Sequence, residues 1–321
     1  MTSRRAVIAL GGNAMTGPDG AATPGAQQAA LAVAAGAIAD VVAAGVEVVL
    51  THGNGPQVGN LLVKNEMAAG VVPPVPLDWC VAQTQATVGF TLTDELDAAL
   101  AARGLDRRTA ALVTRTLVDP ADPRFAAPSK PIGRYLPAEE AARFLALGQR
   151  WEDRGPRGWR RVVASPEPRS VVDAPAIAAL VAAGFVVVCA GGGGVPVVAE
   201  QPMRGVEAVI DKDLTAALLA RELGADTLVV ATDVPHVVLG FGTDAARPLG
   251  RVTPAEMRTH AAAGEFGSGS MGPKVEAVLR FVADGGSRAV ITSLEHISDA
   301  VSGDGVGTVV QKDRPLPTKE E

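Results

Sequence analysis

Six short apolar runs alternate along this chain with Ala- and Leu-rich segments of helical length. The runs are rich in Val, Ile and Leu without a strict apolar–polar alternation, which is typical of strands buried on both faces of a parallel sheet. We expect strands at Ala6–Leu10, Val46–Thr51, Thr109–Thr114, Phe185–Ala190, Thr227–Thr232 and Ala289–Thr292, and helices at Gly25–Ala44, Asp78–Arg103, Asp173–Ala183, Asp211–Leu223 and Pro273–Asp284. This β-α-β order predicts an α/β layered sandwich.

Composition excludes several classes of protein. The chain has 321 residues, 47% of them hydrophobic, which is enough for one large domain or two ordinary ones. The net charge of −6 argues against a broad nucleic-acid-binding surface, so an anionic ligand would need a few placed cations and backbone amides. The two cysteines, Cys80 and Cys189, cannot form a disulfide framework or a Cys-rich metal site.

Neither a signal peptide nor a membrane span is expected. The N-terminal MTSRRAVIALGGN has too short an apolar core for a signal peptide, and the apolar stretch Ala26–Val49 is interrupted by Asp40 and Glu47. A content of only two cysteines is typical of a protein whose thiols are buried and stay reduced in a reducing compartment. We therefore expect a soluble, cytoplasmic protein without membrane contacts.

One stretch interrupts the alternation of strands and helices. From Val118 to Val172 the chain becomes rich in Pro, Arg and Trp, as in DPADPRFAAPSKPIGRY and RGPRGWRRVV. It is too long for a structureless loop in a compact domain. We interpret it as an inserted lobe or lid on a single domain of residues 1–321, with a helix at Ala138–Gly148. An exposed insertion without a role in function is the alternative.

Four glycine-rich turns lie where a strand ends or a helix begins. They are Gly11-Gly12-Asn13, Gly53-Asn54-Gly55, Gly191–Gly194 and Gly267–Ser270. The first three follow expected strands, where ligands bind in open α/β sheets, and glycine lets backbone amides approach an anion. Tight turns without a ligand are the alternative for any one of them. No Walker A motif occurs, and the G-x-G-x-x-G at Gly267–Gly272 does not follow a strand, which disfavours a dinucleotide site.

Three lysines stand at unusual positions. Lys212 begins an expected helix between two aspartates, and Lys274 follows Gly272-Pro273 at another helix start. A lysine at a helix N-terminus opposes the helix dipole, so a bound anion would compensate it. Lys130 lies between prolines in the insertion. Ordinary surface lysines are the alternative, but lysines together with glycine turns indicate a phosphate site.

The histidines show no catalytic or metal-binding arrangement. His52, His236, His260 and His296 are scattered and lack metal-ligand spacing, and no Ser-His-Asp or Cys-His triad is apparent. His52 adjoins a glycine turn, where we expect a structural role. We therefore expect no protein-held metal centre.

Eight motifs in order carry a resemblance to a known family. They are VIALGGNA at Val7–Ala14, THGNGPQVGNLL at Thr51–Leu62, SKPIG at Ser129–Gly133, RGWRRVV at Arg157–Val163, AGGGGVPVV at Ala190–Val198, GVEAVIDKD at Gly205–Asp213, GSMGPK at Gly269–Lys274 and AVITSLEH at Ala289–His296. Together they closely resemble the carbamate kinases of the amino acid kinase superfamily, over nearly the whole chain.

The resemblance implies an open αβα sandwich around a mainly parallel sheet, a small protruding subdomain and a homodimer. It implies reversible phosphoryl transfer between ATP and carbamate, giving ADP and carbamoyl phosphate, with Mg²⁺ accompanying the nucleotide. The direction expected from family use is ATP synthesis, as part of arginine metabolism. A non-catalytic sensor of carbamoyl phosphate or nucleotide, and another small-acid kinase of the superfamily, are the alternatives.

Site residues follow from the matching motifs. Lys130, Lys212 and Lys274 match the family's active-site lysines, and Asp213 matches the carboxylate that organises them. Several superfamily relatives carry a lysine where this chain has Ala9, and Lys130 would replace it. We expect substrate binding by Gly11, Gly12, Asn13, Gly53, Asn54 and Gly55, and nucleotide binding by Gly191, Gly192, Asp211, Ser270, Met271 and Pro273.

Two segments depart from the family pattern. Thr232-Asp233-Val234-Pro235-His236 has Pro235 where relatives usually carry an acid, and Phe266-Gly267-Ser268 replaces the usual Phe-Ala-Pro. Both lie near the expected nucleotide site. They concern adenine contacts and nucleotide preference rather than the phosphate chemistry.

Overall fold

A computed structural model of the chain describes residues 4–12, 15, 23–267, 271–303 and 306–312. Its central element is an eight-stranded sheet, parallel except where β17 runs against β16. In spatial order the strands are β15 (Arg251–Val252), β17 (Thr308–Gln311), β16 (Arg288–Ser293), β12 (Thr227–Thr232), β1 (Arg5–Leu10), β2 (Glu47–His52), β9 (Val186–Val188) and β3 (Thr109–Ala111). The expected mainly parallel sheet is confirmed.

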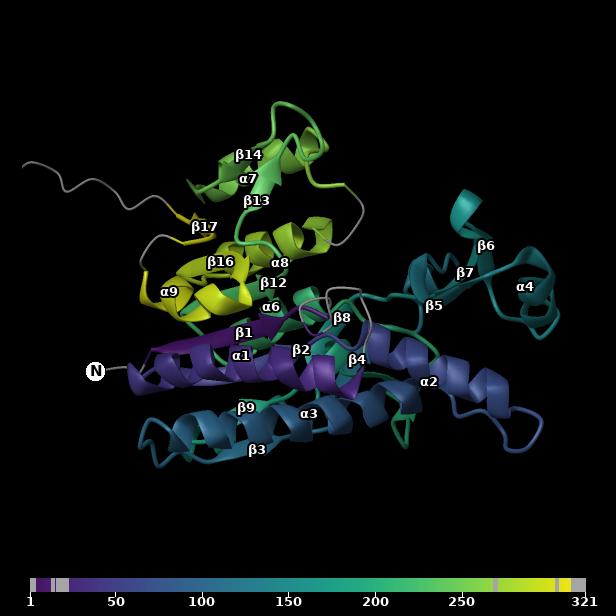
Figure 1. Cartoon of the computed structure of the whole chain (residues 1–321), viewed down its shortest axis with the longest axis horizontal. Helices are drawn as coiled ribbons and strands as arrows, with labels where there is room; N and C mark the ends of the chain where they lie inside the picture. Colours follow the sequence, from purple (N-terminus) through teal and green to yellow (C-terminus); the bar gives the residue numbers. More distant parts are fainter. Residues whose placement is uncertain (1–3, 13–14, 16–22, 268–270, 304–305, 313–321) are drawn as a thin grey trace, which may run out of the picture.

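Helices cover both faces of this sheet (Figure 1). One face packs against α1 (Pro24–Ala43), α3 (Leu77–Ala101) and α9 (Ile297–Ser302), and the other against α5 (Ala174–Ala182), α6 (Lys212–Glu222), α7 (Pro254–Ala262) and α8 (Met271–Ala283). In β1, Val7 and Ala9 face the second layer while Ile8 and Leu10 face the first. A strand buried on both faces explains why its sequence shows no polar alternation.

Helix α1 illustrates how local sequence sets the boundaries. The hydroxyl of Thr23 accepts a hydrogen bond from the Ala26 amide, Pro24 occupies the first turn, and Gly45 adopts a φ of +78° just beyond the end. The helix is long and apolar enough to cross a membrane by length and composition alone. Its packing against α3 and the sheet is that of a core helix in a soluble domain.

A second sheet and a hairpin extend the body. The four-stranded sheet comprises β11 (Arg204–Gly205), β10 (Val195–Val198), β4 (Arg115–Val118) and β8 (Pro168–Val171), and the hairpin comprises β13 (Val237–Leu239) and β14 (Arg247–Leu249). Short 3₁₀ turns occur at Pro123–Phe125, Gly155–Arg157, Gly191–Gly193 and Leu294–His296. Because β4 and β8 pair with each other, they anchor both ends of the segment that interrupts the alternation.

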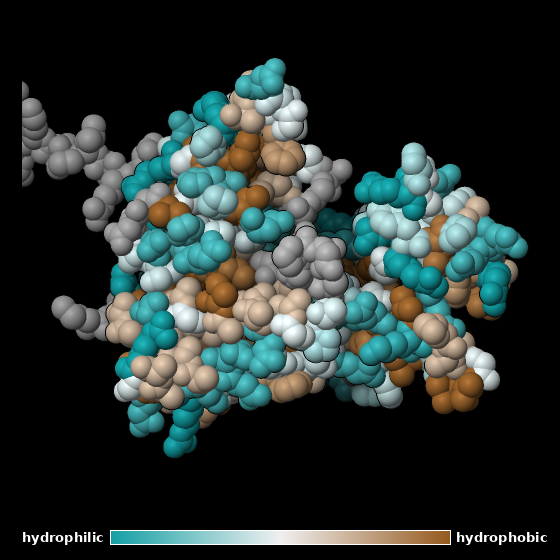
Figure 2. Space-filling view, in the orientation of Figure 1, coloured by the Kyte–Doolittle hydropathy of each residue, from teal (hydrophilic) through white to brown (hydrophobic). Residues whose placement is uncertain are grey.

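Between these anchors, residues 130–163 form a subdomain that protrudes beside α2 (Gly55–Ala68), at the right of Figure 1. It contains β5 (Lys130–Leu136), β7 (Trp159–Val163) and β6 (Trp151–Asp153) in one antiparallel sheet, with α4 (Ala138–Leu145). Its own small core is built from buried Leu136, Ala141 and Trp151, and the Phe144 and Trp151 rings stack at 5.5 Å. Figure 2 shows a hollow between this subdomain and the body.

Candidate active site

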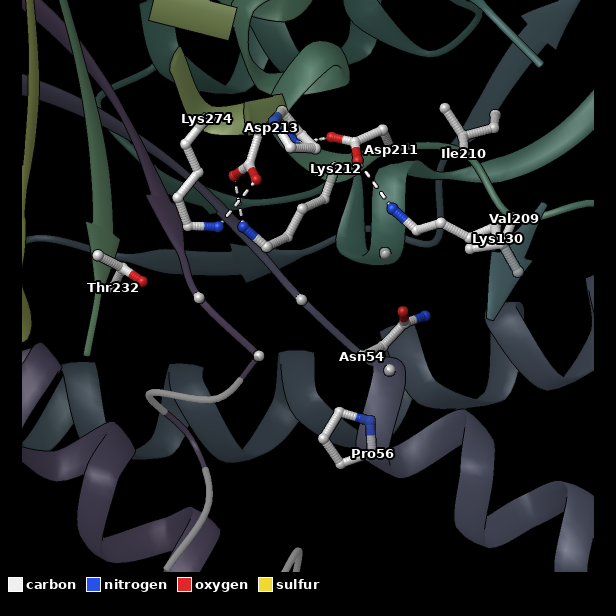
Figure 3. A pocket seen from close by; sticks show the side chains of 16 residues that line it. Asn54, Pro56, Lys130, Val209, Ile210, Asp211, Lys212, Asp213, Thr232 and Lys274 are labelled. Atoms are coloured by element: carbon white, nitrogen blue, oxygen red, sulfur yellow. Dashed lines mark hydrogen bonds and ion pairs between the residues drawn. The ribbon is translucent and has the colours of Figure 1, made fainter. Parts of the chain in front are cut away.

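A cleft of about 210 Å³ opens at the carboxyl ends of β1, β2 and β12. Its lining combines glycine turns with three lysines and two aspartates (Figure 3). The lining residues are Gly11, Gly12, Gly53, Asn54, Gly55, Pro56, Lys130, Gly192, Val209, Ile210, Asp211, Lys212, Asp213, Thr232, Pro273 and Lys274. The expected location at the ends of parallel strands is thus where these residues meet.

At two positions in the glycine turns, Gly53 and Gly192, the packing leaves no room for a side chain. A Cβ on Gly53 would lie 2.6 Å from the Gly12 nitrogen, and a Cβ on Gly192 would lie 2.1 Å from Nδ2 of Asn54. Gly192 also has a φ of +63°, which L residues with side chains rarely adopt. Asn54 is itself fixed, because its Nδ2 donates to Oγ1 of Thr84 at 2.9 Å. Backbone therefore forms the floor of the cleft.

Asp213 joins two lysines from different helices. Its Oδ2 accepts from Nζ of Lys274, in the first turn of α8, at 3.1 Å, and its Oδ1 accepts from Nζ of Lys212, the first residue of α6. Asp213 is 3% exposed and Lys274 is 5% exposed. In Figure 3 both ammoniums converge on the carboxylate and face the cleft. One buried and one partly buried cation therefore share one anion.

Burial and neighbouring charges shift the pKa values of Asp213 and Lys212, and the direction of each effect can be stated separately. Burial alone would raise the pKa of Asp213, but the Lys212 and Lys274 ammoniums outweigh it and hold that pKa below its usual range. Burial lowers the pKa of Lys212, and Lys274 adds to this effect while Asp213 opposes it. An incoming anion would relieve the repulsion between the two lysines.

Asp211 connects the protruding subdomain to α6. Its Oδ1 caps the helix by accepting from the amides of Asp213 at 3.0 Å and Leu214 at 3.3 Å. Its Oδ2 accepts from Nζ of Lys130, at the start of β5, at 2.8 Å. Three lysines from three separate elements thus reach one cleft.

His52 supports the site from below without lining it. The ring is buried, its Nδ1 lies 2.9 Å from the Gly53 carbonyl, and a Cβ on Gly191 would collide with it at 2.4 Å. Burial lowers the pKa of His52 to about 4, and the nearby Lys212 charge contributes to the lowering. The neutral ring therefore donates to Gly53, in agreement with the structural role expected for this residue.

A second buried network holds Gly191 and its neighbours in place. Nε2 of Gln85, on α3, donates to the Thr114 carbonyl at 3.1 Å, and Oε1 of Gln85 accepts from the Thr114 amide at 3.0 Å. Oγ1 of Thr114 accepts from the amide of Ala190, which has a φ of +50°. The polar contacts offset the cost of this left-handed backbone two residues beyond β9.

The expected site residues divide into three groups in the structure. Lys130, Lys212, Lys274, Asp211, Asp213, Pro273, Gly192 and the described residues of the first two glycine turns line the cleft. Gly191 lies behind it against His52, and Met271 begins α8 and packs on the core. Asn13 and Ser270 lie outside the described residues.

Pro56, Val209, Ile210 and Thr232 also line the cleft. Of these, only Thr232 belongs to a segment that the sequence placed near the nucleotide site, and it was not expected as a site residue itself. Thr232 ends β12, so its place at the end of a strand was the available signal. Val209 and Ile210 are the first two residues of the VIDKD motif. Their side chains are apolar, so nothing in the sequence was a chemical reason to expect them in a phosphate site. Pro56 follows the second glycine turn directly.

The described residues contain no group of three or more His, Cys, Asp or Glu side chains able to hold a metal ion. The two carboxylates of the cleft, Asp211 and Asp213, are both engaged by lysines. The donor set therefore fits an anion-binding site and does not fit a metal cage formed by protein alone.

Comparison with known proteins identifies the class. The model of the amino acid kinase family matches residues 4–293. The chain therefore belongs to the amino acid kinase family.

Within that family the chain is similar over nearly its whole length to carbamate kinases. The carbamate kinase of Thermococcus kodakarensis is 45% identical over 307 residues, covering 94% of this chain and 97% of that protein. Carbamate kinase 1 of Enterococcus faecium is 40% identical over 311 residues, with coverage of 96% and 99%. The structure of Giardia lamblia carbamate kinase bound to AMP-PNP superposes with a TM-score of 0.91 at 38% identity, covering 97% of this chain and 99% of that one.

Proposed function

We propose that this protein is a carbamate kinase, which transfers a phosphoryl group reversibly between ATP and carbamate to give ADP and carbamoyl phosphate. One observation carries the proposal: three lysines from separate elements converge with two aspartates on a cleft floored by glycine backbone. The full-length similarity to carbamate kinases supports the same reaction.

The chemistry needs charge compensation more than proton transfer. In the forward direction an oxygen of the carbamate anion forms a bond to the γ-phosphorus of ATP while the bond to the β,γ-bridging oxygen breaks, and ADP leaves. The nucleophile is already an anion, so it requires no general base, in keeping with a site whose nearest histidine is buried and neutral. The protein's task is to bring two anions together and hold the phosphoryl group in line.

Each lysine has a place in this scheme. Lys274, in the first turn of α8, would hold nucleotide phosphates, while Lys130, from the subdomain, would contact the carbamoyl phosphate end. Lys212, between them, would follow the transferring phosphoryl group. Asp213 would hold the ammoniums of Lys212 and Lys274 in position.

Backbone amides would share the work with the lysines. The turns containing Gly11, Gly12, Asn13, Gly53, Asn54 and Gly55 would bind carbamate or carbamoyl phosphate. Gly191, Gly192, Asp211, Ser270, Met271 and Pro273 would shape the nucleotide side. Glycine at these turns permits the close approach that an amide-to-phosphate contact requires.

Mg²⁺ belongs to the proposal as a companion of the nucleotide. Because the two cleft carboxylates are already ion-paired, the metal would be held chiefly by ATP or ADP phosphates, whose charge it would partly neutralise. We further propose a cytoplasmic homodimer that runs mainly toward ATP synthesis in arginine metabolism.

A coupled assay tests the function. Purified protein is supplied with carbamoyl phosphate, ADP and Mg²⁺, and ATP formation is followed with hexokinase and glucose-6-phosphate dehydrogenase. The expected result is sustained ATP formation that Lys212→Ala abolishes. Nucleotide binding without ATP formation would instead indicate a sensor, and turnover only with a different acyl phosphate would indicate another small-acid kinase.

A further inference from the structure

A second and larger cavity, of about 620 Å³, adjoins the phosphoryl cleft between α2 and β5. Asn54, Gly55, Pro56 and Val209 line both cavities, so the two share a wall. The shared residues lie on the side of Lys130 and Val209, away from Thr232 and Lys274 in Figure 3. The second cavity therefore meets the cleft on the side opposite the proposed nucleotide phosphates.

The lining of the second cavity is electropositive. It contains two arginines, Arg134 and Arg160, and no aspartate or glutamate. Arg134 is partly compensated by carboxylates, at 3.5 Å from Glu66 and 3.7 Å from Glu140. Arg160 makes no ion pair within the part of the chain that the structure describes. A concave site with unmatched positive charge concentrates anions.

Arg160 is held in place by neutral contacts. Its Nε donates to the Gly133 carbonyl at 3.2 Å, its Nη1 donates to the Tyr135 hydroxyl at 3.4 Å, and its guanidinium lies 5.0 Å from the centre of the Tyr135 ring. These contacts fix the guanidinium plane without neutralising its charge. Such a group is preorganised to bind a phosphate or carboxylate through its remaining N–H donors.

The N-terminus of α2 adds to the positive character of the shared wall. This helix has 14 residues and begins at Gly55, and its N-cap residue Asn54 makes no capping hydrogen bond with its side chain, which instead donates to Thr84. Amides of the first turn are therefore left without that partner and contribute the positive end of the helix dipole.

We propose that this second cavity receives carbamoyl phosphate, or carbamate in the direction that consumes ATP, before it reaches the phosphoryl cleft, and that Arg160 is its anion-binding residue. The proposal rests on the proposed function for the identity of the anion. The acceptor substrate would arrive past α2 and β5 while the nucleotide occupies the side of Thr232 and Lys274, so neither substrate blocks the other. Arg160 binds and positions the substrate and takes no part in the bond-making step.

Steady-state kinetics test the proposal with a matched control. Arg160→Ala should raise the KM for carbamoyl phosphate by about 10- to 100-fold, as expected for one lost hydrogen bond to a charged group, and leave the KM for ADP within about twofold. Arg160→Lys should restore part of the loss. Arg157 lies 5.4 Å from the same Tyr135 ring but is exposed and does not line the cavity, so Arg157→Ala should leave both KM values unchanged.

Equilibrium binding separates this proposal from the proposed function. Calorimetry with phosphonoacetamide, a non-transferable mimic of carbamoyl phosphate, should show binding to the wild type and to Arg157→Ala and a loss with Arg160→Ala. If the protein binds the mimic through Arg160 but makes no ATP, the proposed carbamate kinase activity is wrong, whereas the proposed anion site in the second cavity is supported. Unchanged binding and KM in Arg160→Ala, an equal loss in Arg157→Ala, or no binding by the wild type would each overturn the proposal.

Discussion

His52 makes the stability of this protein depend on pH in a predictable window. Its pKa is about 4 in the folded chain against 6.5 for an ordinary histidine, because burial disfavours the imidazolium. Between these values the unfolded chain binds a proton that the folded chain does not bind. The free energy of unfolding therefore falls as the pH drops from 6.5 toward 4, and the loss levels off below 4.

The size of the effect follows from the two pKa values. Relative to pH 7.5, the linkage relation gives a loss of about 2 kcal/mol at pH 5 and about 3 kcal/mol at pH 4. The buried ring is shielded from solvent, so screening does not reduce this value greatly. A loss of 2 kcal/mol is a substantial part of the stability of an ordinary domain.

Urea unfolding measured at pH 7.5, 6 and 5 tests this reasoning with one variant. His52→Asn keeps a side-chain N–H that can donate to the Gly53 carbonyl but carries no titrating group. The variant should be less stable at pH 7.5, because it leaves space beside Gly191, and the gap between the two proteins should narrow by about 2 kcal/mol at pH 5. If the gap stays constant between pH 7.5 and 5, the ring is not held neutral by burial and the argument is wrong.

Four further predictions concern the cleft and the subdomain. Lys274→Ala should cut turnover by about 10²–10³ and weaken nucleotide binding with the fold intact, which unchanged ATP formation at saturating ADP would contradict. Lys130→Ala should lower turnover by a similar factor with little change in ADP affinity, and Lys130→Arg should rescue only partly; near-full turnover in the alanine variant would refute the role. Hydrogen exchange in residues 118–172 should slow when nucleotide and substrate analogue are both bound, and slow, ligand-independent exchange would exclude a lid. Gly192→Ala should destabilise the protein more than Gly148→Ala in urea unfolding, because both have positive φ but only Gly192 meets a close neighbour; equal losses would remove the steric argument.

Much of the central sheet could be predicted because the residues within each strand are themselves typical of a buried strand. The observed β12 coincides with the expected Thr227–Thr232, β1 begins one residue earlier than expected, and β2 is shifted by one residue at both ends. These strands are buried on both faces, so apolar β-branched residues follow one another without interruption. The expected strands at Thr109–Thr114 and Phe185–Ala190 are shorter in the structure, because the chain turns to make the polar contacts around Thr114 and Ala190.

Other elements depend on tertiary contacts that the local pattern does not carry. Helix α2 was not expected, since Gly55, Pro56 and Gly59 are poor helix formers, yet Pro56 lies in the first turn where its missing N–H costs no hydrogen bond. The four-stranded sheet joins strands of two to four residues from distant parts of the chain. Helix α8 begins at Met271, two residues before Pro273, for the same first-turn reason.

The site was partly predictable because two of its lysines stand at helix N-termini, where a positive charge is unfavourable. Lys212 and Lys274 in the first turns of α6 and α8 oppose the helix dipoles, and this placement is visible in the sequence. The pair formed by Lys130 and Asp211 spans 81 residues, and the fit of Gly192 against Asn54 depends on two separate turns meeting. No local pattern contains either contact.

We propose that Lys130, from the subdomain, takes the place of a lysine that this chain lacks at Ala9 in β1. Ala9 is fully buried beneath the sheet's helical layer, so a lysine there would have to emerge from the core, whereas Lys130 reaches the cleft from outside. The ammonium of Lys130 donates to one carboxylate oxygen of Asp211, and the other oxygen accepts from two amides at the start of α6. Binding of carbamoyl phosphate would exchange one anionic partner of Lys130 for another at the same mouth of the cleft. Lys130 would thereby have an anionic partner before and after binding, which avoids the desolvation cost of an unpaired ammonium.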